Sequence, residues 1–221
     1  MKIQLCKSRR VFYLCYPNKR INAVNPTMKL FDLIFGLPPK AKNVIDGLPS
    51  YWDDYYCQIE IVSVKNIEHI KTTIREIQEF SERRSTEFGI TDVYIRKGLP
   101  YPTVGQKIRI DHFEKLLAEW HFGKAKQIRS NGTVIDCTNA TANAFSLPCF
   151  NIFYNCEDGL IKNIWTSSSL IVSTDHFGKI LEALHALGKT FDLVLIDWHR
   201  CELIDLKDKA QITEHLMWDW K

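Results

Sequence analysis

The chain has 221 residues, of which 45% are hydrophobic and 25% are charged, and its formal net charge at pH 7 is +3. This composition is typical of a folded globular protein, and it excludes collagen-like and low-complexity chains. The longest uninterrupted apolar run, Val11–Tyr16, is far shorter than the ~20 residues of a membrane-spanning helix and is short for the core of a signal peptide. We therefore expect a folded cytoplasmic protein that does not cross a membrane.

Positive charge is concentrated at the start of the chain. The first 50 residues carry nine Lys and Arg against two Asp and Glu, whereas residues 111–221 carry 11 against 15. A basic segment can bind nucleic acid, but a solvated basic face is the commoner outcome. The sequence pI of about 8.4 is also low for a nucleic-acid binder. We expect no tight binding of nucleic acid and keep weak binding through the basic N-terminus as an alternative function.

Residues 1–104 predict an α/β part. Strands at Met1–Cys6 and Val11–Tyr16 and a short helix after Asn25-Pro26 come first. A strand at Tyr55–Val64 then leads into a long helix at 66–88 with Asn66 as its N-cap. The helix carries one apolar stripe, formed by Ile67, Ile70, Ile74, Ile77 and Phe80. A strand at Ile90–Ile95 would complete a crossover that places two parallel strands in one sheet.

Residues 105–221 predict an α+β part, separated from the first by the candidate linker Gly98–Gly105, although one continuous domain is an alternative. The pattern Asp-His-Phe-x-Lys-x-Leu occurs at 111–117 and again at 175–181, and the second copy belongs to a long helix at 175–187. Each copy follows a β-rich segment, Lys107–Ile110 or Leu170–Ser173, and precedes a hairpin. Either the strand–helix–hairpin unit is duplicated, or unrelated helices share Asp as an N-cap and Gly as a stop signal.

Three hairpins and a terminal helix are predicted in this second part. Asn131-Gly132 joins Ala125–Ser130 to Thr133–Thr138, and Asp158-Gly159 joins Cys149–Asn155 to Leu160–Trp165. The third hairpin pairs Phe191–Asp197 with Cys201–Leu206. The terminal helix begins at Asp208, with Ile212, Leu216 and Met217 as its inward-facing residues. The chain as a whole is therefore expected to be α+β, with a mixed sheet and packed helices.

The sequence contains no recognised catalytic, cofactor or metal motif. Its seven cysteines are odd in number and irregularly spaced and include no C-x-x-C pair, which argues against a disulfide framework and against zinc. We expect free thiols, no metal and no cofactor. Cys201 lies close to His199 and Asp197, which could form a nucleophile–base–orienter set, but a hairpin turn explains the same residues. An enzyme with an unrecognised Cys- or carboxylate-based site remains an alternative function.

Two clusters are candidate partner-binding sites. The first is the aromatic and acidic cluster Tyr51-Trp52-Asp53-Asp54-Tyr55-Tyr56, of which Tyr51, Trp52, Asp53 and Asp54 are the candidate binding residues, although half of its rings could belong to the core. The second, Trp198-His199-Arg200, joins two apolar strands and contains none of the usual turn residues. Trp and Arg are enriched in binding hot spots. We predict a partner-binding tip there; the alternative is that Trp198 folds back onto the sheet and only Arg200 is solvated.

The end of the chain resembles the end of the small bacterial immunity proteins that neutralise polymorphic toxins. The resemblance rests on Phe191–Trp198, on Glu202–Leu206 and on the helix at Asp208–Leu216. It implies a non-catalytic α+β protein that binds one cognate toxin and blocks it. Immunity proteins against nucleases are often strongly acidic, whereas this chain carries +3, so a nuclease is not the expected partner.

Overall fold

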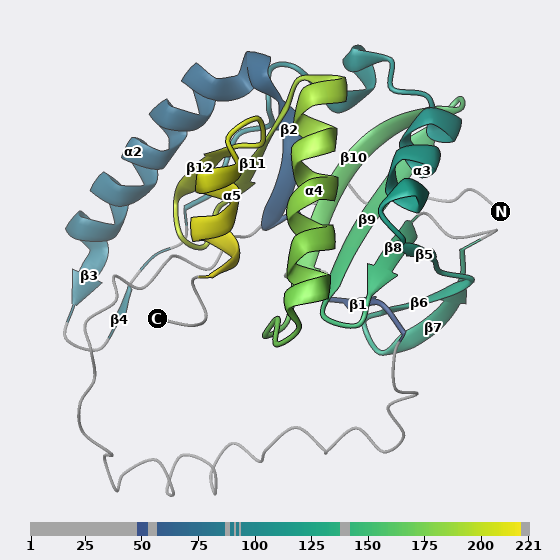
Figure 1. Ribbon diagram of the computed structural model, residues 1–221. Helices are drawn as coiled ribbons and strands as arrows, with labels where there is room; N and C mark the ends of the chain where they lie inside the picture. The colour runs from purple at the N-terminus through teal and green to yellow at the C-terminus, as the bar shows by residue number, and fades with distance from the viewer. Residues whose placement is uncertain are drawn as a thin grey trace, which may run out of the picture.

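The computed structural model describes residues 48–52, 57–86, 89–90, 92, 94–137 and 142–217. These residues form an α+β protein, as predicted, built on an antiparallel seven-stranded sheet in the order β12-β11-β2-β10-β9-β8-β5 (Figure 1). A smaller mixed sheet has the order β1-β6-β7. The predicted elements before residue 48, the basic segment within them, and Asp53 and Asp54 lie outside the described residues.

The helices and strands have the following bounds: β1 Ser50–Tyr51, β2 Ile59–Ser63, η2 Val64–Asn66, α2 Ile67–Arg84, β3 Ser85–Thr86, β4 Gly89–Ile90, η3 Thr103–Gln106, α3 Ile110–Glu119, β5 Gly123–Lys124, β6 Gln127–Ser130, β7 Thr133–Asp136, β8 Asn143–Leu147, β9 Phe150–Glu157, β10 Leu160–Ser168, α4 Thr174–Phe191, β11 Leu193–Asp197, β12 Glu202–Asp205 and α5 Lys209–Leu216.

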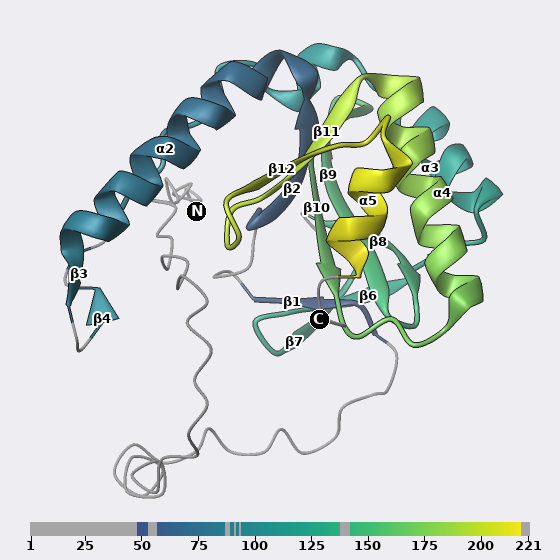
Figure 2. The same cartoon turned by 60° about the vertical axis from the view of Figure 1, so that its left-hand side comes forward.

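Both faces of the large sheet are covered, which explains why its central strands are apolar on both sides. Helices α3, α4 and α5 pack on one face, against residues such as Ile61, Ile152 and Leu195 (Figure 2). The opposite face is shared between two elements. Helix α2 covers Val62 and Val194, whereas the small sheet covers the face of β8, β9 and β10. Because successive residues of a strand point to opposite faces, one strand contributes to both cores.

The long helix predicted at 66–88 is confirmed as α2, and Ile70 and Ile77 of its stripe are buried. Asn66 precedes the helix, but its side chain does not cap it. Its Nδ2 donates to the Tyr101 carbonyl oxygen (2.9 Å), and its Oδ1 accepts from the Tyr101 N–H (3.1 Å). The buried amide therefore holds the 98–106 segment against the start of α2.

The predicted parallel crossover is wrong. After α2 the chain forms the short antiparallel pair β3–β4, and of the predicted strand Ile90–Ile95 only Ile90 lies in a strand among the described residues. Both edges of β2 are already used by β10 and β11, each antiparallel to it. Strands β10 and β11 lie more than 90 residues further along the chain, so local periodicity could not reveal that they would pair with β2 in place of the expected parallel strand.

The large sheet also crosses the boundary proposed between residues 104 and 105. Strand β2 comes from the first part and lies between two strands of the second part. The candidate linker is packed rather than free, because Thr103 is buried and Gln106 hydrogen-bonds Ser63. This arrangement favours the alternative of one continuous domain.

The three predicted hairpins are confirmed. Asn131-Gly132 and Asp158-Gly159 form the loops of β6–β7 and β9–β10, and all four residues have positive φ, as a type I′ turn requires. Helix α5 is also confirmed, with the Asp208 carboxylate accepting from the N–H groups of Ala210 and Gln211. Met217, predicted to face inward, is exposed instead.

The duplication is not confirmed. Asp111 and Asp175 were expected as N-caps, but both lie one residue inside their helices. Arg109 occupies the cap position of α3 without a side-chain bond, and Ser173 caps α4 through the His176 N–H. The two following hairpins belong to different sheets, and neither preceding segment forms a regular strand.

Candidate functional site

The predicted binding tip after β11 is divided between the two faces of the sheet. Trp198 is only 4% exposed, so the expectation of an exposed Trp is wrong and the fold-back alternative holds for this ring. Its Nε1–H donates to Glu60 Oε1 at 2.7 Å, and the Arg96 guanidinium lies 3.9 Å from its ring centroid. Trp198 follows Val194 and Ile196 on the face that α2 covers, and this alternation directs the ring inward.

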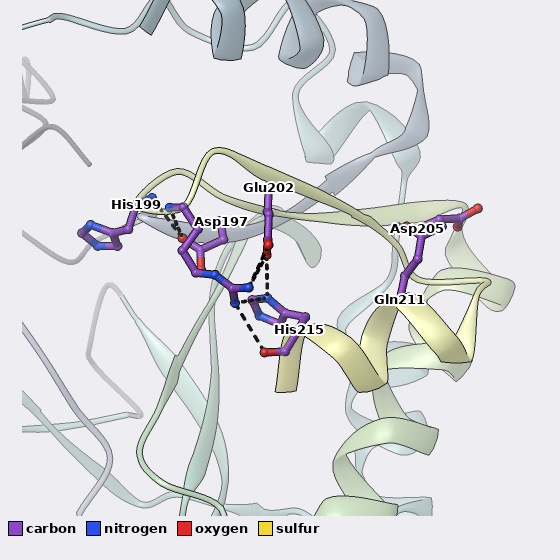
Figure 3. Close-up of polar contacts among 7 residues, drawn as sticks. Asp197, His199, Glu202, Asp205, Gln211 and His215 are labelled. Atoms are coloured by element: carbon purple, nitrogen blue, oxygen red, sulfur yellow. Dashed lines mark hydrogen bonds and ion pairs between the residues drawn. The ribbon is translucent and has the colours of Figure 1, made fainter. Parts of the chain in front are cut away.

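Arg200 lies on the helix-covered face, where α5 holds it in place through His215, a residue that Figure 3 shows in the cluster. Its guanidinium donates to Glu202 Oε1 (2.8 Å) and to His215 Nδ1 (3.1 Å), and its side chain is only 18% exposed. His199 is half-buried, and Figure 3 shows its ring directed away from His215. The tip therefore offers a fixed guanidinium rather than a freely solvated one.

The charges around Arg200 are set by burial. Burial, and secondarily the charge of Arg200, lower the pKa of His215 from 6.5 to about 4, so the ring is neutral at pH 7. The 3.7 Å approach of Glu202 to His215 is consequently not an ion pair at neutral pH. Burial raises the pKa of Asp197, and the N–H bonds and positive charges of Arg200 and His199 oppose that change.

Asp197 stabilises the turn between β11 and β12 and does not orient a catalytic histidine. Its Oδ1 accepts the backbone N–H groups of His199 (2.9 Å) and Arg200 (3.1 Å). The Cys201 thiol donates to the Trp198 carbonyl oxygen at 3.7 Å. These contacts stabilise a tight turn between β11 and β12. The hairpin turn therefore explains why Asp197, His199 and Cys201 lie close together.

A small polar cavity lies beside this cluster. Its volume is about 110 Å³, and its lining includes Asp197, Arg200, His215, Ser168 and Ser169. Asp197 reaches it because it shares the helix-covered face of β11 with Leu193 and Leu195. The two serines come from the end of β10 and the residue after it.

The first predicted cluster lies on a second cavity of about 390 Å³, which we call the aromatic cavity. Tyr51 and Trp165 line it, and their rings meet edge to face with centroids 5.4 Å apart. Tyr51 belongs to the buried core, whereas Trp52 is 55% exposed and also lines the cavity. Of the two described rings of the cluster, Tyr51 therefore belongs to the core and Trp52 to the surface, and Tyr55 and Tyr56 lie outside the described residues.

Ser168 and Ser169 line both cavities, so the two form one surface, which we call the composite surface. At the end of β10 consecutive side chains point to opposite faces. Tyr51 and Trp52 line one of the two cavities, and Arg200, about 150 residues further along the chain, lines the other. The sequence pattern did not single out Ser168, Ser169 or His215. Glu60 carried a usable signal, because a carboxylate within the apolar run Ile59–Val62 needs a buried partner.

We expect the protein to lose stability as the pH falls from 6.5 towards 4. In this window the unfolded chain protonates His215 near pH 6.5, whereas the folded protein resists protonation until about pH 4. The stability that the neutral ring contributes is complete above pH 6.5, and about 2 kcal/mol of it is lost by pH 5. Asp197 acts in the opposite direction, because its raised pKa favours the folded state in acid.

Urea unfolding of the wild type and of His215→Gln at pH 7.5 and pH 5.0 measures this effect. Both proteins retain Asp197, so the difference between their changes in stability with pH is the contribution of the His215 imidazole. The variant should lose about 2 kcal/mol less than the wild type between the two pH values. The same pH dependence in both proteins would contradict the assignment.

Comparisons of the chain with protein-family models, with curated proteins and with solved structures found no match. Within the described part of the chain, no cluster of three or more His, Cys, Asp and Glu side chains is placed to hold a metal ion. None of the described helices is both long enough and apolar enough to span a bilayer.

Proposed function

We propose that the chain is a cytoplasmic protein-binding module of the immunity type, which binds a cognate toxin and blocks it without catalysis. The composite surface is the observation that carries this proposal, because it joins an exposed Trp to a fixed guanidinium. The resemblance of residues 191–216 to immunity proteins supports the kind of partner. Cys137, Cys149 and Cys156 carry free thiols, which suits a reducing compartment.

The chemistry of this surface fits a protein better than a nucleic acid. Trp52 offers a large apolar area at the rim, and Arg200 can bind a carboxylate or carbonyl with little loss of side-chain entropy. Two carboxylates, Asp197 and Glu202, accompany this single cation. They would repel phosphate groups, which dominate nucleic-acid affinity.

Co-expression tests the function directly. The polypeptide encoded by the reading frame directly upstream of this gene is expressed alone and then together with the chain. We expect growth arrest in the first case and normal growth in the second, with both polypeptides in one complex on gel filtration. If the upstream polypeptide arrests growth and the chain neither restores growth nor binds it, the proposal is wrong.

Replacing Trp52 by Ala should weaken binding of that toxin about 30-fold or more, since interface hot spots contribute about 2 kcal/mol or more. Thermal stability should hardly change, because the ring is largely exposed. Calorimetric titration measures the affinity, and a thermal melt measures the stability. Tyr101→Ala is the matched control, because Tyr101 is an exposed ring that does not line either cavity. Equal affinity losses in the two variants would show that the composite surface is not the binding site.

A further inference from the structure

A thiol and an imidazole meet at the wall of the aromatic cavity. Cys149 lies between β8 and β9 and lines the cavity, and its Sγ is 4.0 Å from Nδ1 of His176. His176 belongs to the first turn of α4, where its N–H donates to the Ser173 side chain. Both side chains are half-buried. The pair therefore combines a nucleophile, a base and a space that a small molecule can enter.

The surroundings decide which chemistry this pair can perform. Burial raises the pKa of Cys149, so the resting group is a thiol and a base is needed when it attacks. The His176 Nδ1 is placed to take that proton. The N-terminus of the 18-residue helix α4 lies beside the sulfur and favours negative charge there. The Cys149 carbonyl oxygen accepts the Ser169 N–H at 2.9 Å, which fixes the turn that carries the thiol.

We propose that Cys149, with His176 as its base, forms a mixed disulfide with a low-molecular-weight disulfide that enters the aromatic cavity. The Cys149 sulfur attacks one sulfur of the incoming disulfide, whose S–S bond breaks as the new one forms. The thiol proton passes to His176 Nδ1 and then to the departing thiolate, which leaves as a free thiol. Cys149 is oxidised and half of the small disulfide is reduced, so electrons and atoms balance. This inference is independent of the proposed toxin partner.

Glutathione disulfide is the probe for this reaction. The full-length reduced chain is incubated with it at pH 7.5, and peptide mass spectrometry follows the modification of each cysteine over time. Cys156 is an internal reference, because it is more exposed than Cys149 and reports accessibility alone. We expect Cys149 to react at least about 5-fold faster than Cys156. A Cys149 rate at or below the Cys156 rate would overturn the proposal.

Substitution of the base provides the second test. His176→Gln and His176→Asn should each lower the Cys149 rate at least about 10-fold, since general bases contribute that much or more. The Cys156 rate in the same samples should stay unchanged, and thermal melts identify which variant keeps the wild-type fold. His112→Gln is the matched control, because His112 holds the same position of the repeated pattern on α3 and is exposed. An unchanged Cys149 rate in a folded His176 variant would show that the imidazole is not the base.

Discussion

Replacing Gly188 by Ala should destabilise the protein by about 3 kcal/mol, the upper end of the usual cost of overpacking a core. Gly188 lies within α4, where an added Cβ would sit 2.5 Å from Leu206 Cβ and 2.7 Å from its carbonyl oxygen. Leu206 is buried between β12 and α5, so its backbone cannot move away without shifting both elements. The steric cost therefore outweighs the gain of about 1 kcal/mol that Ala normally brings to a helix interior.

Gly178 of the same helix is the matched control. An added Cβ there meets nothing within 4 Å, so Gly178→Ala should stabilise the protein by about 0.5 to 1 kcal/mol. Urea unfolding of both variants measures the two free energies. Opposite signs are expected from the same chemical change. A Gly188→Ala protein as stable as the wild type would mean that α4 does not approach Leu206 so closely.

Removing the carboxylate of Glu60 should cost about 3 to 5 kcal/mol, the range found when one partner of a buried ion pair is deleted. Glu60 and Arg96 have side chains only 4% and 2% exposed, and Glu60 Oε1 lies 2.5 Å from Arg96 Nη1. The same carboxylate accepts the Trp198 Nε1–H. In Glu60→Ala the guanidinium would remain buried with its main counter-charge removed, and the indole would lose its acceptor.

Replacing both members of the pair separates the cost of an uncompensated charge from the cost of losing the pair. Glu60→Leu combined with Arg96→Met should be less destabilising than Glu60→Ala alone, because no uncompensated charge remains. Glu68→Ala is the comparison for an exposed pair, and breaking its contact with Lys71 should cost less than about 1 kcal/mol. Denaturant unfolding measures all four proteins. Similar small losses for Glu60→Ala and Glu68→Ala would contradict the buried arrangement.

Elements whose causes are local could be predicted from the amino-acid sequence alone. The β6–β7 and β9–β10 turns follow from Asn-Gly and Asp-Gly, because these residues tolerate the positive φ of a two-residue turn. The isoleucine stripe of α2 and the cap of α5 depend on residues two to four apart. The α+β class follows from the sum of such elements, and no tertiary information is needed for it.

Only the tertiary structure decided how these elements combine. The neighbours of β2 are strands about 100 residues or more away in the sequence, and their antiparallel pairing replaced the expected crossover. The fate of Trp198 depended on Glu60 and Arg96, whose distance from it in sequence hides the pairing from any local pattern. The composite surface arises in the same way, since the cavities lined by Trp52 and by Arg200 share residues only where β10 ends, at Ser168 and Ser169. A side chain of the large sheet is buried when a helix or the small sheet covers its face of the strand. Long-range packing determines which element covers which face.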